Sequence, residues 1–204
     1  MWRIFYPLRY FALHNAEKSK LDTWPTLIFT ILLSFPYIIS ENSSFFLAGG
    51  FIDKILPLTS ALTAFYVAAL VGVATFSNES LDKPITLGSI YFIEKDEKGD
   101  PEKEFLTRRE FACIIFGYLS FLALIFSITG ALSITVDMKI GDIKFFVGKS
   151  SYSFETWKIL NIFFTAIFSA ALSHLAVVTS LGLYYLMDRI HLKDPKILTK
   201  KPPG

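Results

Sequence analysis

The chain has 204 residues, of which 52% are hydrophobic, 16% aromatic and 19% charged, and its net charge is +2. The charges lie between long apolar runs, which excludes an ordinary soluble domain, where about 25% of residues are charged and spread along the chain. The near-neutral charge argues against nucleic-acid binding. The one cysteine, Cys113, leaves no intrachain disulfide and no thiolate metal site. We expect no metal and no cofactor.

Residues 1–22 form an N-terminal segment in which the aromatic-rich stretch Trp2–Leu13 is too short to cross a membrane. The aromatics alternate with leucine and arginine, and they are Trp2, Phe5, Tyr6, Tyr10 and Phe11, with Arg3 and Arg9 among them. This pattern predicts a helix lying in the membrane interface. A simple flanking anchor for the first span is the alternative.

Four uncharged runs follow, and a bilayer core about 30 Å thick needs roughly 20 apolar residues in a helix. The predicted spans are about 23–40, 55–77, 111–136 and 159–187. Pro25 lies where a first-turn proline is tolerated, whereas Pro36 should kink or end the first helix. The sequence Thr107-Arg-Arg-Glu110 predicts a capping box that starts the third helix. The expected fold is an all-α, four-helix transmembrane bundle over residues 23–187.

The lysines and arginines predict the orientation of this bundle. Fifteen of the 20 lie in the N-terminal segment, in the second loop (78–110) and in the tail (188–204). The other five lie in the first loop and in the third (137–158). Because cytoplasmic segments carry the excess of basic residues, both termini are expected in the cytoplasm.

Both longer loops contain β-hairpin signals. In the second loop Ile85–Ile93 is β-prone, Lys98–Pro101 is a turn signal and Glu102–Leu106 is a candidate returning strand. In the third loop the alternating run 136–140 and the run 143–147 flank Gly141-Asp142, which predicts a hairpin with a two-residue turn. The outer hairpin is either a sensing or assembly surface or a lid over the helix ends.

The second loop carries nine acidic and six basic residues, a mixture that favours a solvated face or a protein partner over a lipid-binding polybasic patch. The candidate docking residues combine this loop with the basic tail, and they are Glu94, Asp96, Glu97, Arg108, Arg109, Lys200 and Lys201.

Two stripes of small or polar residues recur at intervals of four within the spans. The second span carries Ser60, Ala64, Ala68 and Gly72, and the fourth carries Asn161, Thr165, Ser169 and Ser173. Small residues allow close approach of membrane helices, so the stripes predict packing within one chain or between chains. A wet path along the fourth span is the alternative.

His174 is the only ionisable side chain deep within a predicted span. Such a residue is a functional hypothesis by default, and gating or proton sensing is one reading. A neutral imidazole that hydrogen-bonds to a neighbouring helix is the other. The candidate intramembrane polar site combines this histidine with the polar stripe of the fourth span, and its residues are His174, Ser173, Ser169, Thr165 and Asn161.

No catalytic pattern accompanies these features. The chain has no HExxH, no P-loop, no GxSxG and no paired intramembrane carboxylates, and Asp82 and Asp188 stand alone. We therefore expect that the protein is not an enzyme.

The segment Leu106–Leu122, LTRREFACIIFGYLSFL, together with four short-looped spans and cytoplasmic termini, resembles the KwaA family. These are membrane subunits of the bacterial Kiwa anti-phage defence system, and the resemblance extends over the whole chain in size and topology. It implies a multi-pass protein of the bacterial inner membrane that oligomerises and detects phage attack. It also implies a soluble cytoplasmic partner, KwaB, which binds DNA and blocks phage replication or expression. No functional residue of the family transfers to a position here.

Three hypotheses follow. The first is a membrane sensor and scaffold that recruits a cytosolic effector. The second is an oligomeric channel or pore that uses the polar face of the fourth span. The third is a membrane enzyme, for which the residues offer no catalytic constellation. Under each hypothesis we expect membrane lipid to surround the spans.

Overall fold

The computed structural model describes residues 3–14, 19–39, 45–46, 48–77, 81–85, 90–95, 101–135, 143–147, 150–154 and 156–184. In chain order its elements are the 3₁₀-helix η1 (Arg3–Ala12), the π-helical turn η2 (Ser19–Thr23), α1 (Trp24–Ile39), α2 (Phe51–Thr75), β1 (Tyr91–Lys95), β2 (Pro101–Phe105), α3 (Arg108–Thr135), β3 (Ile143–Val147), β4 (Ser150–Phe154) and α4 (Thr156–Tyr184).

The expectation of a mainly helical membrane protein is confirmed. Three helices in the described part of the chain are long and apolar enough to cross a membrane by length and composition: α2, α3 and the part of α4 from Ile159 to Tyr184. The first predicted span is a shorter apolar helix of 16 residues, α1. A fourth crossing and the side on which the termini lie stay predictions.

The helix ends follow from local sequence. At the start of α3 the Thr107 amide donates to Glu110 Oε2 at 2.9 Å, and the Glu110 amide donates to Thr107 Oγ1 at 3.2 Å, which confirms the predicted capping box. Pro25 falls in the first turn of α1, as predicted, and α1 continues past Pro36 to Ile39. α2 begins at Phe51, before the uncharged run, and so includes Asp53 in its first turn.

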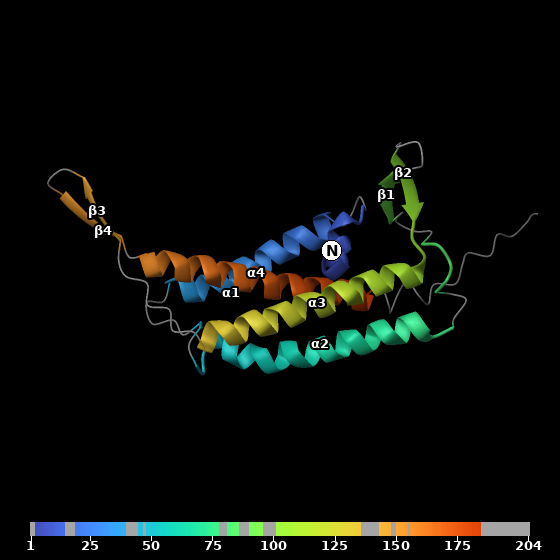
Figure 1. The fold of residues 1–204 in the computed structure, drawn as a ribbon, viewed down its shortest axis with the longest axis horizontal. Helices are drawn as coiled ribbons and strands as arrows, with labels where there is room; N and C mark the ends of the chain where they lie inside the picture. The colour runs from blue at the N-terminus through green and yellow to red at the C-terminus, as the bar shows by residue number, and fades with distance from the viewer. Residues whose placement is uncertain are drawn as a thin grey trace, which may run out of the picture.

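The four helices run alternately up and down and lie in the spatial order α2, α3, α4, α1 (Figure 1). The helix η1 packs on α3 at the end of the bundle where β1 and β2 also lie, and we call this end the η1 end. The hairpin of β3 and β4 lies at the opposite end, beyond the start of α4 (Figure 1).

The second loop forms a hairpin as predicted, with shifted bounds: β1 begins at Tyr91, near the end of the β-prone run Ile85–Ile93, and continues to Lys95. It pairs antiparallel with β2, with Tyr91 opposite Phe105 and Lys95 opposite Pro101. The outer loop contains a pairing that was not predicted. Ile143–Val147, the predicted returning strand, pairs antiparallel with Ser150–Phe154. The predicted first strand 136–140 and the predicted turn Gly141-Asp142 lie outside the described residues.

Two buried clusters hold the bundle together. The larger lies at the η1 end and joins Tyr10 and Leu13 of the N-terminal segment, Phe92 of β1 and Leu119 of α3. The smaller lies at the other end around Phe45, Ile52, Phe126 and Phe168. The outer helix faces instead expose large apolar side chains, among them Leu27, Ile31, Phe35, Phe65, Val71, Ile128, Leu132, Phe163 and Ile167. Such surfaces suit lipid rather than water.

Candidate functional site

The candidate site forms where the first helix begins, inside the η1 end. His174 lies ten residues before the last residue of α4, which at 1.5 Å per residue is about 15 Å along the helix. It contacts Asp22 and Thr26, at the start of the first helix. The first helix therefore begins beside the middle of α4 and not beside its C-terminal end. The helix η1 covers this end of the bundle, and its segment buries Tyr10 and Leu13.

Asp22 and His174 form a buried pair across 152 positions of sequence. His174 Nδ1 lies 3.2 Å from Asp22 Oδ1, an ion-pair distance, although Oδ1 makes no hydrogen bond of good alignment. Thr26 Oγ1 lies 3.4 Å from the same ring nitrogen. Asp22 is only 7% exposed. A carboxylate and an imidazole at this distance and burial interact more strongly than a surface pair.

Tyr10 ties η1 to this pair. Its hydroxyl donates to Asp22 Oδ2 at 3.1 Å, and its ring stacks on Tyr118 of α3 with centroids 4.5 Å apart and planes 11° apart. Burial, together with the neighbouring Asp22 carboxylate, raises the pKa of Tyr10 well above its ordinary value. The phenol therefore stays protonated and remains a hydrogen-bond donor.

Aromatic rings enclose the imidazole. Phe11 stacks on His174 with planes 10° apart and centroids 5.8 Å apart, and Tyr118 meets the same ring edge-on at 5.6 Å. The second ring nitrogen, Nε2, is buried without a hydrogen-bond partner among the described residues. Two aromatics from η1 and one from α3 thus close a polar pair off from its surroundings.

The polar stripe of α4 lies directly beyond His174. Ser173, Ser169 and Thr165 are buried, and Asn161 is half-buried, with Thr165 Oγ1 donating to Asn161 Oδ1 at 3.4 Å. The hydroxyls of Ser169 and Ser173 have no partner among the described atoms. The stripe therefore faces the inside of the single chain.

The small-residue stripe of α2 takes no part in packing within the chain. Ser60, Ala64 and Ala68 are exposed and Gly72 is half-buried. α2 instead meets its neighbours through another face, where Thr59 accepts a hydrogen bond from Ser127 at 2.9 Å. The stripe is left to lipid or to another chain.

The predicted docking arginines have structural roles in the chain. Arg108 is buried. Arg109 Nη1 donates to the carbonyl oxygens of Val73 and Phe76 at 2.7 and 2.8 Å, which caps the end of α2, and its Nε donates to Asp82 Oδ1 at 2.7 Å. This joint between α2 and α3 leaves neither arginine as an exposed docking group.

The structure describes the remaining docking candidates only in part. Glu94 lies in β1, where only the backbone is described, and Asp96, Glu97, Lys200 and Lys201 lie outside the described residues. Asp82 is exposed, and the hydrogen bond from Arg109 lowers its pKa below the ordinary value.

The cluster holds η1 against the helices through the Tyr10–Asp22 hydrogen bond and the stacking of Phe11 on His174. Sequence reasoning found His174 but not its partner Asp22, and it placed Tyr10 only among the interfacial aromatics. Asp22 lies immediately before the first apolar run, a position typical of a solvent-exposed residue that flanks a span. The one available signal was that a lone His inside a span requires a polar partner from another helix. The described residues contain no group of three potential metal ligands.

Comparison of the chain with protein-family models, characterised proteins and solved structures finds no match. The function must therefore be argued from the residues and the geometry above.

Proposed function

We propose that the chain is the membrane sensor and scaffold subunit of a bacterial anti-phage defence complex. In this proposal it oligomerises in the inner membrane with both termini in the cytoplasm and recruits a soluble DNA-binding effector similar to KwaB. The η1 end is then the cytoplasmic end, because the basic residues gather there. The resemblance to KwaA supplies the system, and the construction of the η1 end supplies the docking surface.

The observation that carries the proposal is that the β1–β2 hairpin is fixed to the helices. An isolated hairpin is marginal in water. Here the His14 amide donates to the Tyr91 carbonyl oxygen at 3.0 Å and the Tyr91 amide donates back at 3.3 Å. Phe92 and Leu106 are buried in the cluster that contains Tyr10 and Tyr118. A hairpin held in this way protrudes as a firm surface, which favours binding of a partner at low entropic cost.

The outward face of this hairpin combines apolar and basic side chains. The register places Tyr91 and Ile93 opposite Phe105 and Lys103 on one face. Ile93 is 51% exposed and Phe105 is 56% exposed, and Lys103 Nζ lies 4.8 Å from the Tyr91 ring centroid. Exposed aromatic and aliphatic side chains with a polar rim are typical of protein interfaces.

The test is purification from the native host in mild detergent, with mass determination of what accompanies the chain and in how many copies. We expect a soluble DNA-binding protein, lost or reduced at least about tenfold in Ile93→Glu, since a buried charge costs more than 1.4 kcal/mol. Phe76→Glu is the matched control, because Phe76 is also a large, exposed apolar residue but lies outside the hairpin. Purification of the wild type without a soluble partner, or equal losses in both variants, contradicts the proposal.

An oligomeric channel is the second candidate, favoured by the buried hydroxyls of Ser169 and Ser173 near His174, which have no hydrogen-bond partner within the described part of the chain. A water-filled path along α4 would satisfy them. Liposome flux that disappears in His174→Ala and Ser173→Leu supports the channel, and flux that is absent under every condition removes it.

A further inference from the structure

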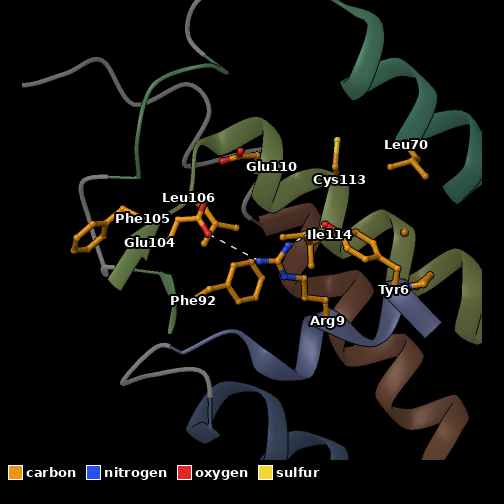
Figure 2. A pocket seen from close by; sticks show the side chains of 12 residues that line it. Tyr6, Arg9, Leu70, Phe92, Glu104, Phe105, Leu106, Glu110, Cys113 and Ile114 are labelled. Atoms are coloured by element: carbon orange, nitrogen blue, oxygen red, sulfur yellow. Dashed lines mark hydrogen bonds and ion pairs between the residues drawn. The ribbon is translucent and has the colours of Figure 1, made fainter. Parts of the chain in front are cut away.

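A partly open cavity of about 390 Å³ lies at the η1 end, separate from the Asp22–His174 pair. It is bounded by η1, the hairpin, α2 and α3 (Figure 2). Its lining residues are Tyr6, Pro7, Arg9, Leu70, Phe92, Glu104, Phe105, Leu106, Glu110, Cys113, Ile114 and Gly117. Its volume falls in the range of about 300–1,000 Å³ that is usual for small-molecule sites.

The floor of the cavity is apolar and lies at a shallow depth in the bundle. Leu70 lies five residues before the end of α2, and Gly117 lies nine residues after the start of α3. At 1.5 Å per residue these positions are about 8 and 14 Å from the helix ends. Where these helix ends lie at the membrane surface, Leu70 is at the depth of about 5–10 Å where head groups meet acyl chains, and Gly117 lies slightly deeper. η1 itself exposes Ile4, Phe5 and Phe11 beside it, as an interfacial helix does.

The rim carries one cation and two carboxylates. Figure 2 shows the Arg9 guanidinium between the side chains of Phe92 and Tyr6. Its Cζ lies 4.1 Å from the Phe92 ring centroid, and its Nη1 donates to the Tyr6 hydroxyl at 2.9 Å. Arg9 also faces Glu104 at 3.9 Å, a long pair whose carboxylate side chain is 60% exposed. Such pairs contribute little to stability and exchange readily for another partner. Glu110 stands on the far side of the cavity (Figure 2).

We propose that this cavity binds a phospholipid of the adjoining leaflet whose head group is zwitterionic and bears a primary ammonium. The phosphate lies against Arg9, the ammonium donates to Glu104 and Glu110, and an acyl chain follows Leu70, Ile114 and Gly117. An anionic glycerol head group meets two carboxylates without an ammonium to offset them. A choline head group has the positive charge but cannot donate hydrogen bonds.

The experiment is native mass spectrometry of delipidated protein in detergent. The probe is an equimolar mixture of phosphatidylethanolamine, phosphatidylglycerol and phosphatidylcholine with identical oleoyl chains. We expect the ethanolamine lipid to be retained about tenfold over each of the others, the ratio that a single charge-assisted hydrogen bond supplies. Binding is measured on purified protein, so the result does not depend on the proposed defence role.

Gly117→Leu tests whether the lipid occupies this cavity. A Cβ built at Gly117 meets no atom within 4 Å, and Gly117 lines the cavity, so we expect the leucine side chain to occupy part of its volume. Leucine also favours the helix over glycine by up to about 1 kcal/mol, so the variant should fold. We expect the ethanolamine adduct to fall about tenfold. Ala131→Leu adds bulk at an exposed position about four turns further along α3 and should leave the adduct unchanged.

Two results overturn the proposal. Equal retention of the three lipids, or preference for phosphatidylglycerol, shows that the head group is not recognised. Full retention of the ethanolamine lipid by Gly117→Leu, with gel filtration and melting temperature like those of the wild type, shows that it binds elsewhere. Loss in Gly117→Leu with retention in Ala131→Leu supports the cavity.

Discussion

Asp22 links η1 to α4, because it accepts from Tyr10 and pairs with His174, so Asp22→Ala gives the sharpest test of the site. The substitution removes the acceptor of the Tyr10 hydroxyl and the acidic partner of His174 together. Helix packing around α2 and α3 loses nothing. We therefore expect local detachment of η1 and not global unfolding.

The size of the effect follows from the two lost interactions. A buried hydroxyl left without its partner costs about 1–3 kcal/mol, and breaking a buried polar pair adds to this. We take about 2–3 kcal/mol as the loss in the docking free energy of η1. Since 1.4 kcal/mol corresponds to a tenfold change in an equilibrium constant, the open population rises about 30- to 150-fold.

Hydrogen exchange followed by mass spectrometry in lipid nanodiscs measures this population. The amides of Leu13 and His14 are hydrogen-bonded to the carbonyl oxygens of Tyr10 and Tyr91, so the peptide over residues 10–14 reports docking. In Asp22→Ala its exchange should accelerate by the factor above, while peptides from the middle of α3 keep the wild-type rate. Asp53→Ala is the control, because Asp53 caps a helix at the opposite end. Exchange of residues 10–14 within threefold of the wild type would refute the reasoning.

Three further predictions concern the joints between helices. Tyr66→Phe removes the 2.6 Å contact between the Tyr66 hydroxyl and Thr179 Oγ1, which joins α2 to α4; at about 1 kcal/mol the melting temperature should fall by about 2–4 °C. Gly130→Leu should cost about 1–3 kcal/mol, because a Cβ there already lies 2.9 Å from an α2 side-chain carbon, and the melting temperature should fall in proportion. The hydrogen bond from Arg109 lowers the pKa of Asp82. The Asp82–Arg109 contact therefore stabilises the joint between α2 and α3 fully above the ordinary pKa of about 4, and this stabilisation is lost as pH falls through the lowered pKa. The loss is measured as faster hydrogen exchange at residues 81–85 in acid.

Each of these has a matched control. Gly117→Leu makes the same change on the same helix in open space and should not lower the melting temperature. Asp82→Asn should remove the acid dependence of exchange at residues 81–85, and persistence of that dependence would assign it to another group. A Thr179→Val variant that adds a further loss to Tyr66→Phe would show that the two hydroxyls do not act as a pair.

Local sequence signals predicted the elements of this fold well where the signal is contained in a few residues. The uncharged runs correspond to α1–α4, and the Thr107–Glu110 capping box starts α3. The turn at Lys98–Pro101 corresponds to the β1–β2 hairpin. The pairing of Ile143–Val147 with Ser150–Phe154 was not predicted, because the sequence between them, Gly148-Lys149, meets the same turn requirement as Gly141-Asp142.

The contacts that make the site could not be predicted in the same way. Asp22 and His174 belong to opposite ends of the sequence, and their contact depends on how far the first helix starts below the end of α4. Hydrophobic periodicity reports which residues avoid water and says nothing about the relative height of two helices. In the same way, the stripe from Ser60 to Gly72 predicted a close-packing face, but only the arrangement of the neighbours shows that this face points outward.

The double variant Asp22→Asn with His174→Phe separates the two readings of His174, structural glue and proton-dependent gate. The introduced amide oxygen still accepts from Tyr10, and the introduced ring still stacks on Phe11. Replacement of a buried polar pair by groups of similar shape is often neutral, so exchange of residues 10–14 should match the wild type. His174→Phe alone leaves the Asp22 carboxylate buried without the imidazole, and its exchange should be faster. Under the proposed defence role, an imidazole that only stabilises the packing leaves any phage resistance conferred by the wild type, measured by plating efficiency, intact in the double variant. Loss of resistance with η1 still docked would contradict this reading and assign the titratable imidazole itself to the response.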